Sequence, residues 1–312
     1  MKNQTCKNSK KLRDRLNEYK DIYIMIAPVV LFFLVFSYYP MYGIVIAFKD
    51  FSSFKGILGS EWLDPFYKNF EWLFSQDYFT RALLNTLKIS CLKLIFCFPF
   101  PIILSLFLAE ISKDVIKRRV QICLYLPFFI SWASIASIIY NFLAVNGGLV
   151  NNIVTLFGGK AISFLTGEKY FYTILIIAEI WKNAGWGTVT YTAAISNVPP
   201  GLYEVAKIDG CSRIQAMWKI TLPCISPIIV VMFIMSVGGL LNAGFDSIFN
   251  LYNTAVYSVA DILDTYVYRL GISSGNYEKA ATLGLFKSAI NVILLIGCDR
   301  IIKKITGQGM YE

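Results

Sequence analysis

The chain has 312 residues, of which 56% are hydrophobic and only 16% are charged, and its mean hydropathy is +0.56. Soluble domains carry charge on about a quarter of their residues, so this composition excludes a water-soluble globular enzyme. The formal net charge is +9, and in so apolar a chain a basic excess is expected on cytoplasmic loops rather than on a nucleic-acid surface. Histidine, the commonest metal ligand and general base, is absent from the sequence.

Six apolar stretches are long enough to cross a bilayer, which requires about 20 residues of helix. They cover residues 22–48, 82–109, 120–145, 170–195, 220–245 and 280–298. The second stretch contains Lys88 and Lys93, the fourth contains Glu179 and Lys182, and the sixth contains Lys287. The predicted fold class is therefore all-α: a polytopic membrane protein with six transmembrane helices.

The distribution of basic residues predicts the orientation of these helices. The N-terminal tail, residues 110–119, residues 196–219 and the C-terminal tail hold 17 Lys and Arg residues, whereas the opposite loops hold 7. Because basic loops stay inside, we expect both termini to be cytoplasmic. The Lys-rich tail of residues 1–21 serves topology, with binding to anionic membrane lipid as a second role.

The loop after the first span is rich in aromatic residues, which are enriched at membrane interfaces. It is expected to form an interfacial helix that includes Trp62, Phe66, Tyr67, Phe70, Trp72, Phe74, Tyr78 and Phe79. A second uncharged stretch, residues 247–260, is too short to cross the membrane, so we expect an extracellular loop or a re-entrant segment there.

The spacing of the cysteines predicts neither a disulfide nor a metal site. There are seven, without a CxxC pair, and none lies in a long outer loop of the predicted topology. We therefore expect neither disulfides nor a metal site, and interpret them as small apolar packing residues: Cys6, Cys91, Cys97, Cys123, Cys211, Cys224 and Cys298.

The predicted cytoplasmic loop at residues 199–223 has the local signals of two short helices. Pro200 suits the first helical turn and Gly210 suits the left-handed position after a helix, so Leu202–Ile208 is expected to be a capped helix. Ser212 followed by Gln215 three residues later predicts a capping box at the start of a second helix. A helical hairpin of this kind is either a solvated connector or a docking surface for a cytoplasmic partner.

The same loop resembles the EAA loop of binding-protein-dependent ABC importer permeases. The matching residues are Glu204, Val205 and Ala206, then Asp209 and Gly210, and finally Ile220, Leu222 and Pro223 of the closing Ile-x-Leu-Pro. One position departs from the family pattern, since Val205 stands where the first of two alanines is usual. The motif precedes the penultimate predicted span, as it does in that family.

Other segments are similar to the oligosaccharide and polysaccharide branch of the family. They include residues 26–28, 39–42, 48–51, 84–87, 125–132 and 264–269. The resemblance implies a type I permease of the bacterial cell membrane. It divides into a tail (1–21), a first helix with an aromatic outer loop (22–79), a permease core (80–299) whose EAA loop spans 199–223, and a C-terminal tail (300–312).

The resemblance also implies the partners. We expect a second permease subunit, either a copy of this chain or, as the polysaccharide branch suggests, a related chain that forms a heterodimer. Two cytoplasmic ATPase subunits and an extracytoplasmic solute-binding protein complete the expected assembly. The chain has no phosphate-binding loop of its own, because Gly158-Gly159-Lys160-Ala161 lacks the distal glycine and the hydroxyl that such a loop needs. We therefore expect no cofactor and no catalytic residue here, with ATP and Mg²⁺ bound by the ATPase subunits.

Polar residues within the spans are candidates for a substrate pathway. A sugar needs aromatic platforms and amide or hydroxyl groups, although such residues more often join helices to one another. Glu179 and Lys182 lie three residues apart, and we expect them to pair with each other. The pathway candidates are Trp132, Tyr140, Asn141, Asn183, Trp186, Tyr191, Asn242, Asn250 and Tyr252.

Two other classes of protein compete with the importer subunit. A self-sufficient transporter or channel would be expected to show repeat symmetry or a charged relay within the membrane. A membrane-embedded enzyme would need a clustered nucleophile or metal set. Beyond Glu179 and Lys182, neither pattern is visible in the sequence, and the EAA-like loop favours the importer permease.

Overall fold

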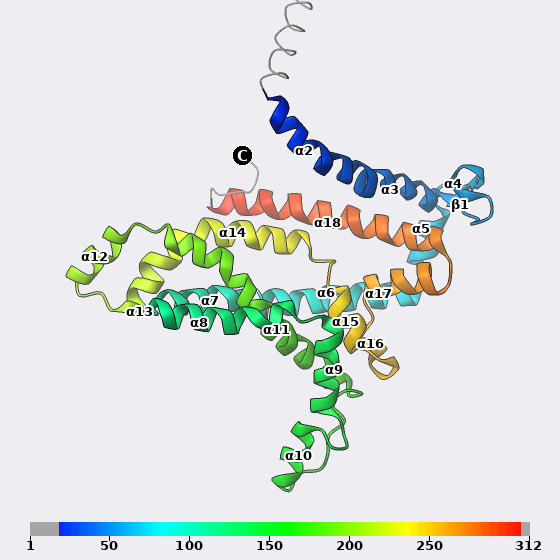
Figure 1. The fold of residues 1–312 in the computed structure, drawn as a ribbon. Helices are drawn as coiled ribbons and strands as arrows, with labels where there is room; N and C mark the ends of the chain where they lie inside the picture. Colours follow the sequence, from blue (N-terminus) through cyan, green and yellow to red (C-terminus); the bar gives the residue numbers. More distant parts are fainter. Residues whose placement is uncertain (1–18, 307–312) are drawn as a thin grey trace, which may run out of the picture. The chain divides into compact units, whose positions relative to one another are not determined.

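The computed structural model describes residues 19–306, which fold into mostly helical structure and separate into two compact units (Figure 1). The units meet in sequence between Asn69 and Phe70. Unit 1 contains the first predicted span, and unit 2 contains the other five. The elements agree with the predicted all-α class, except for one small hairpin in unit 1.

Unit 1 begins with a continuous helical rod of changing pitch. The rod extends from Lys20 to Phe48, and it is long and apolar enough to span a membrane. None of its most apolar 18-residue window is buried within the chain, as expected for a helix surrounded by lipid or by another protein. Its segments are α2 (Lys20–Phe33), the π-helix η1 (Leu34–Tyr38), α3 (Tyr39–Met41) and the 3₁₀-helix η2 (Tyr42–Phe48).

A two-stranded antiparallel hairpin follows the rod, so the aromatic loop is not one interfacial helix as predicted. Strand β1 (Lys49–Asp50) pairs with β2 (Glu61–Trp62) around α4 (Gly56–Gly59). The buried Lys49 ammonium closes the hairpin by donating to the carbonyls of Ile57 (2.7 Å) and Ser60 (3.0 Å). Helix begins again only at α5 (Lys68–Phe74).

Unit 2 is a set of long helices joined by short turns. Helix α11 packs along α7 and α14, and α14 packs along α18 (Figure 1). The elements are α6 (Asp77–Phe96), α7 (Pro99–Ala109), α8 (Asp114–Tyr125), η3 (Leu126–Phe129), α9 (Trp132–Leu143), α10 (Leu149–Leu156), α11 (Glu168–Ser196), α12 (Pro200–Ile208), α13 (Arg213–Ala216), η4 (Met217–Thr221), α14 (Leu222–Gly238), α15 (Phe245–Leu251), η5 (Thr254–Val256), α16 (Tyr257–Ala260), α17 (Leu263–Tyr268), η6 (Arg269–Ser273) and α18 (Tyr277–Thr306).

The six predicted spans all fall on helical segments, but they do not all qualify as simple spans. Within residues 19–306, four helices are long and apolar enough to cross a membrane, and a fifth qualifies if the bent pair around η3 and α9 counts as one span. Helix α11 is 29 residues long, so its length of about 43 Å suffices to cross. The polar residues around Glu179 and Lys182 keep it outside the helices that qualify by composition.

The predicted span at 120–145 is broken rather than straight. The segment Asp114–Phe129 and the segment Trp132–Leu143 meet at an angle of 96°. We call residues 127–131 the elbow. Pro127 and the extended backbone at Ile130 and Ser131 interrupt the helix, and Ser131 then caps α9 by accepting from the Ser134 amide.

The predicted span at 220–245 ends early. Helix α14 stops at Gly238, and residues 239–244 are non-helical before α15 begins. Irregular backbone at membrane depth is stable only if its polar groups find partners inside the protein. The Leu241 amide donates to the Asn291 side chain of α18 (3.2 Å), which supplies such a partner.

Residues 247–260 form short helices and turns rather than a span, in agreement with the sequence. The amide of Asn85 on α6 donates to the carbonyls of Ser258 and Asp261, each at 3.0 Å, and the Leu263 amide donates to the Thr86 hydroxyl at 2.9 Å. Two adjacent side chains of α6 therefore fasten the turn between α16 and α17.

The close contact between α11 and α8 leads to a stability prediction. A Cβ at Gly185 would lie 1.9 Å from the Leu124 carbonyl oxygen, so Gly185→Ala forces two backbones apart. We expect a loss of unfolding free energy of about 3 kcal/mol, measured as a lower midpoint of thermal unfolding in detergent. Gly284→Ala on α18 is the matched control, because a Cβ there meets nothing within 4 Å. Equal midpoints for the two variants would contradict this packing.

Candidate functional site

The loop at residues 199–223, called the coupling loop below, folds as two short helices at one end of the bundle (Figure 1). Pro200 opens α12, and Gly210 follows the helix with a φ of +76°. The Gly210 amide donates to the Lys207 carbonyl (3.2 Å), and the Cys211 amide to the Ala206 carbonyl (2.8 Å). These bonds satisfy the last carbonyls of α12, as the predicted glycine stop requires.

The second helix of the coupling loop starts with the predicted capping box. The Gln215 amide donates to the Ser212 hydroxyl (3.3 Å), and the Ser212 amide donates to the Gln215 side chain (2.8 Å). Helix α13 then passes through η4 into α14 without a break. The Tyr203 and Thr221 hydroxyls form a hydrogen bond of 2.9 Å, which joins α12 to the base of α14.

Helix α12 presents apolar side chains to its surroundings. It buries no residue within the chain, and Ile208 is 85% exposed. Val205 and Ile214 are exposed as well, and Glu204 and Asp209 add carboxylates to the same short hairpin. An exposed apolar surface with a charged rim is typical of a protein contact site. Of the remaining loop residues, Ala206, Ile220 and Leu222 are half-buried, and Gly210 and Pro223 are exposed.

A buried ion pair lies at membrane depth, and it is not the predicted one. Glu179 on α11 pairs with Lys93 on α6, not with Lys182 on its own helix. Only 18% of the Lys93 side chain and 11% of the Glu179 side chain are exposed. The Lys93 ammonium also contacts the Ser247 hydroxyl of α15 (3.3 Å), and the Asn183 amide donates to Glu179 (2.5 Å). The pair therefore connects α6, α11 and α15.

Lys182, the predicted partner of Glu179, binds backbone carbonyls instead. The Lys182 ammonium donates to the carbonyl of Phe128 (2.8 Å) and to that of Ile130, both at the elbow. Trp186, one turn further along α11, stacks on the Phe128 ring with centroids 4.7 Å apart. The prediction failed because the interrupted helix offers unpaired carbonyls to Lys182, while α6 offers an ammonium to Glu179.

A polar cavity of about 260 Å³ adjoins the ion pair. It lies between α6 and the point where α14 loses its helical form. Its wall includes Lys93, the hydroxyls of Ser90 and Ser236, the Cys97 thiol and the amide of Asn242, with the rest contributed by Leu94, Phe98, Gly239 and Leu240. Lys93 lies midway along the candidate span Asp77–Ala109, so the cavity lies beside the middle of that span.

Gly244 allows the irregular segment after α14 to approach the ion pair closely. Gly244 has a φ of +94°, and a Cβ there would lie 2.7 Å from the Lys93 ammonium nitrogen and 2.9 Å from the Ser247 hydroxyl. Only glycine permits both this backbone conformation and this approach. The ion pair therefore lies in close contact with the non-helical segment that follows α14.

The predicted pathway residues separate into two groups. Asn242 lines the polar cavity, and Asn183 donates to Glu179 on its own helix. The others make packing contacts or bond to nearby backbone. Backbone carbonyls accept from three of them: Tyr140 donates to Leu251, Asn141 to Ser137 and Asn250 to Asp246. The remaining four are packed: Trp132 lies against the core, Tyr191 is buried, Trp186 stacks on Phe128 and Tyr252 stacks on Tyr257.

Sequence reasoning missed Ser90, Cys97 and Ser236, although two of them left a signal. Ser90, Lys93 and Cys97 are spaced by three and four residues, which places Ser90 and Lys93 on one face of α6 and Cys97 on the same face directly after its last residue. A lysine deep in a span, flanked at this spacing by small polar residues, indicates a polar face within the protein. Ser236 gives no comparable signal, because its role depends on where α14 ends.

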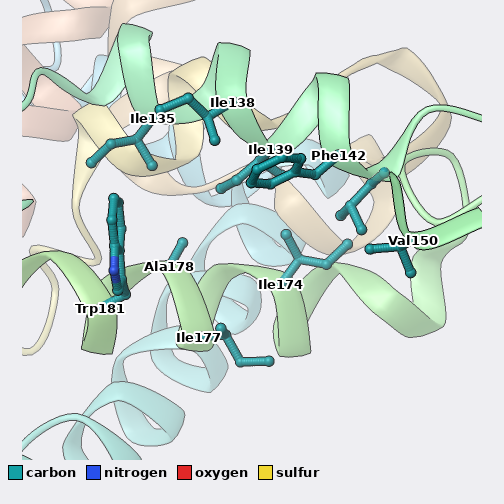
Figure 2. Close-up of a pocket in the computed structure, with 10 residues that line it drawn as sticks. Ile135, Ile138, Ile139, Phe142, Val150, Ile174, Ile177, Ala178 and Trp181 are labelled. Atoms are coloured by element: carbon teal, nitrogen blue, oxygen red, sulfur yellow. The ribbon is translucent and has the colours of Figure 1, made fainter. Parts of the chain in front are cut away.

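A second cavity differs from the first in chemistry. It has a volume of about 310 Å³ and lies between α9, α10 and α11 (Figure 2). Figure 2 shows aliphatic side chains such as Ile135, Ile138 and Ile174 facing one another, with Trp181 at one end. Apart from the Trp181 indole, its lining side chains carry no hydrogen-bonding group. This cavity is unsuited to a hydroxyl-rich substrate.

The remaining intramembrane lysines are also accounted for. Lys287 on α18 pairs with Asp264 on α17. Lys88 is exposed, and its ammonium lies 4.3 Å from the centre of the Tyr172 ring. Within residues 19–306, groups of three or more cysteine and acidic side chains that could hold a metal are absent.

Comparison with known proteins identifies the relatives of this chain. Residues 98–306 match the family described as binding-protein-dependent transport system inner membrane component. The chain is 43% identical over 302 residues to the polygalacturonan/rhamnogalacturonan transport system permease protein YteP of Bacillus subtilis, covering 97% of this chain and 94% of the relative. It is 41% identical to protein LplB of the same organism, covering 94% of this chain and 91% of the relative.

Two solved structures have the same fold along nearly the whole chain. One is a bacterial alginate ABC transporter in complex with an alginate pentasaccharide-bound periplasmic protein, with a TM-score of 0.86, 35% identity, and coverage of 96% of this chain and 100% of that chain. The other is a bacterial ABC transporter involved in the import of the acidic polysaccharide alginate, with a TM-score of 0.86, 36% identity, and coverage of 95% and 99%.

The ion pair generates a prediction about stability. Lys93→Met removes one partner and leaves the Glu179 carboxylate buried without a cation, which costs roughly 3–5 kcal/mol of unfolding free energy. The double variant Lys93→Met/Glu179→Leu leaves no buried charge at either position, and we expect it to regain most of this loss. Thermal unfolding in detergent measures both. A single variant as stable as wild type would show that the two side chains do not depend on each other.

Proposed function

The chain belongs to the family of binding-protein-dependent transport system inner membrane components, and from this premise we propose that it forms one half of the translocation pathway of an ATP-driven sugar importer. It is a transport permease of the ABC class with the type I permease fold. The proposed substrate is an oligosaccharide or polysaccharide fragment, supported by the substrates printed in the names of YteP and of the alginate transporter.

The observation that carries this proposal is the coupling loop. Its two helices are fixed by a glycine stop and a capping box, yet α12 buries no residue of its own. The ends of this short helix are capped, but its apolar side chains are exposed. Such a helix is expected to bind a partner that covers them. We assign that partner as a cytoplasmic ATPase, which would contact Val205, Ile208 and Ile214 through apolar side chains and Glu204 and Asp209 through basic or backbone groups.

The rest of the assembly follows from the same proposal. Two ATPase subunits would bind ATP and Mg²⁺ and hydrolyse the nucleotide. A second, related permease would complete the pathway as a heterodimer, and an extracytoplasmic binding protein would deliver the sugar. Both termini and the coupling loop would then lie on the cytoplasmic side. The apolar rod of unit 1 would contact lipid or another subunit.

The substrate pathway is proposed to pass the polar cavity. Unlike the cavity between α9, α10 and α11, it offers ammonium, hydroxyl and amide groups, which can bond to sugar hydroxyls. It also lies where two spans are interrupted, at the turn between α6 and α7 and at the end of α14. Discontinuous helices near the centre of the membrane are a recurring setting for substrate sites in transporters.

A substitution at the glycine stop tests the proposed docking. Gly210→Pro removes the amide that donates to Lys207 and cannot adopt the φ of +76°, so α12 loses its end. We expect co-purification of an ATPase with the tagged chain from native membranes to fall at least tenfold. A retained ATPase would contradict the role assigned to α12.

The chain offers a closely matched control for this experiment. Gly158 also has a positive φ, +80°, and its amide donates to the residue three positions earlier, Thr155, at 3.0 Å. Gly158→Pro therefore makes the same local lesion after α10, outside the coupling loop, and should leave the ATPase bound. If wild type itself brings down no ATPase, a self-sufficient transporter or channel becomes the better hypothesis.

A further inference from the structure

The apolar cavity between α9, α10 and α11 has exposed walls and a buried end. Ile138 on α9 and Ile177 on α11 line it and are exposed, Ile177 to 63%. Ile135 also lines it but is only 1% exposed. Figure 2 shows Ile135 and Trp181 at one end of the cavity and Val150 of α10 at the other. A molecule that enters between the exposed side chains therefore reaches Ile135 last.

The length of the cavity suits one membrane leaflet. Its wall on α11 extends from Ile174 to Trp181, which is seven residues or about 10 Å of helix. One leaflet contributes about 15 Å of hydrocarbon, half of the bilayer core. Trp181 lies close to the middle of α11 (Glu168–Ser196), and α10 lies beyond its first turns in sequence. The cavity thus runs from the α10 side toward the middle of a membrane-spanning helix.

Helix α10 is held so that its apolar face points away from the protein. Asn151 is buried, and its amide donates to the carbonyls of Ala144 (2.9 Å) and Ile162 (3.0 Å). The helix carries no charged side chain, and exposed apolar residues recur on the face opposite Asn151: Leu149, Ile153, Leu156 and, directly after the helix, Phe157. Such a helix lies at the boundary between lipid headgroups and acyl chains. The α10 end of the cavity is therefore the end at which acyl chains begin.

The chemistry and the size of the cavity select the occupant. Cavities lined by aliphatic side chains stay free of water and take up apolar molecules. A helix of another subunit is too wide, because one turn is about 10 Å across and about 5.4 Å long, which is roughly 400 Å³. The cavity has a volume of about 310 Å³. An acyl chain is narrower than a helix and carries no polar group along its length.

We propose that the cavity binds an acyl chain of a phospholipid from the leaflet on the side of α10, with the methyl end of the chain beside Ile135 and Trp181. In the importer proposed above, this is the outer leaflet. An empty cavity would deprive its lining of van der Waals contacts, and the chain supplies them. The lipid thereby completes the packing between α11 and α9, the helix that follows the elbow.

Photo-labelling by a lipid tests this proposal. The assembled transporter is reconstituted in liposomes of phosphatidylethanolamine and phosphatidylglycerol, in which part of the phosphatidylglycerol carries a diazirine near the methyl end of one chain. After irradiation, mass spectrometry of peptides locates the labelled residues. We expect label on Ile135, which bulk lipid does not reach because the residue is buried. Val292 and Ile293 on α18 are exposed and lie outside the cavity, so they report labelling by bulk lipid.

The position of the diazirine tests the direction of the chain. A probe with the diazirine near the carboxyl end should label Val150 and not Ile135. Label on Ile135 from this probe alone would contradict the direction proposed, because the chain would then enter at the Trp181 end.

Filling the cavity should exclude the lipid. Ala178→Phe enlarges a buried wall residue on α11, and we expect it to lower the Ile135 label, relative to α18, about tenfold. Val189→Phe is the matched control, because Val189 is exposed on the same face of α11, about three turns further along and outside the cavity. Its ratio should equal that of wild type. Where Ala178→Phe does not assemble, Ile138→Trp fills the cavity from an exposed position on α9 and decides the question.

Two further results would overturn the proposal. An unlabelled Ile135 beside a labelled α18 in wild type would mean that the cavity is closed to lipid, for example by side chains of a partner subunit. A wild-type ratio in the variants that fill the cavity would mean that lipid reaches Ile135 by another route. The labelling requires neither an ATPase nor a sugar, so the acyl-chain site and the proposed importer function succeed or fail separately.

Discussion

The Lys93–Glu179 ion pair is the constraint around which the membrane-spanning part of unit 2 is arranged. Neither charge is stable alone at this depth, so the two must stay in contact wherever their helices lie. The contact of Lys93 with Ser247 joins α15 to the ion pair. Gly244 allows the backbone before α15 to approach the Lys93 ammonium. The polar cavity exists because this ion pair holds the end of the broken α14 beside α6.

Interrupted helices explain most of the other polar residues in the spans. Each break exposes amides or carbonyls that lipid cannot satisfy. Lys182 satisfies carbonyls at the elbow, Asn291 accepts from an amide after α14, and Asn85 donates to carbonyls in the turn before α17. Some polar side chains in the spans thus complete the backbone of a different helix, whereas others, such as Ser105 and Thr188, donate to a carbonyl of their own helix.

The sequence predicted the coupling loop in detail and the intramembrane contacts poorly, for a physical reason. A proline at a helix start, a glycine stop and a capping box act within four residues, so Pro200, Gly210 and the Ser212–Gln215 pair could be interpreted without knowledge of the fold. The partner of Glu179 depends on which helix lies opposite, 86 residues away in sequence, and spacing along α11 carries no such information. The early end of α14 was missed because an apolar stretch has the same composition whether it is straight or broken, whereas Pro127 marks the elbow in the sequence as a position that allows a kink.

Helix α11 connects the two parts of the candidate site. From Glu179 to Ser196 it continues for 17 residues, about 25 Å, and only Asn197, Val198 and Pro199 separate it from α12. Gly185 lies against the Leu124 backbone and Gly187 against Pro101, so α11 has little freedom to slide past α8 and α7. Close packing of this kind permits discrete rearrangements of whole helices rather than gradual deformation. In the importer proposed above, a displacement of α12 by an ATPase would therefore move α11 together with α7 and α8, and through Glu179 it would reach Lys93 and the wall of the cavity.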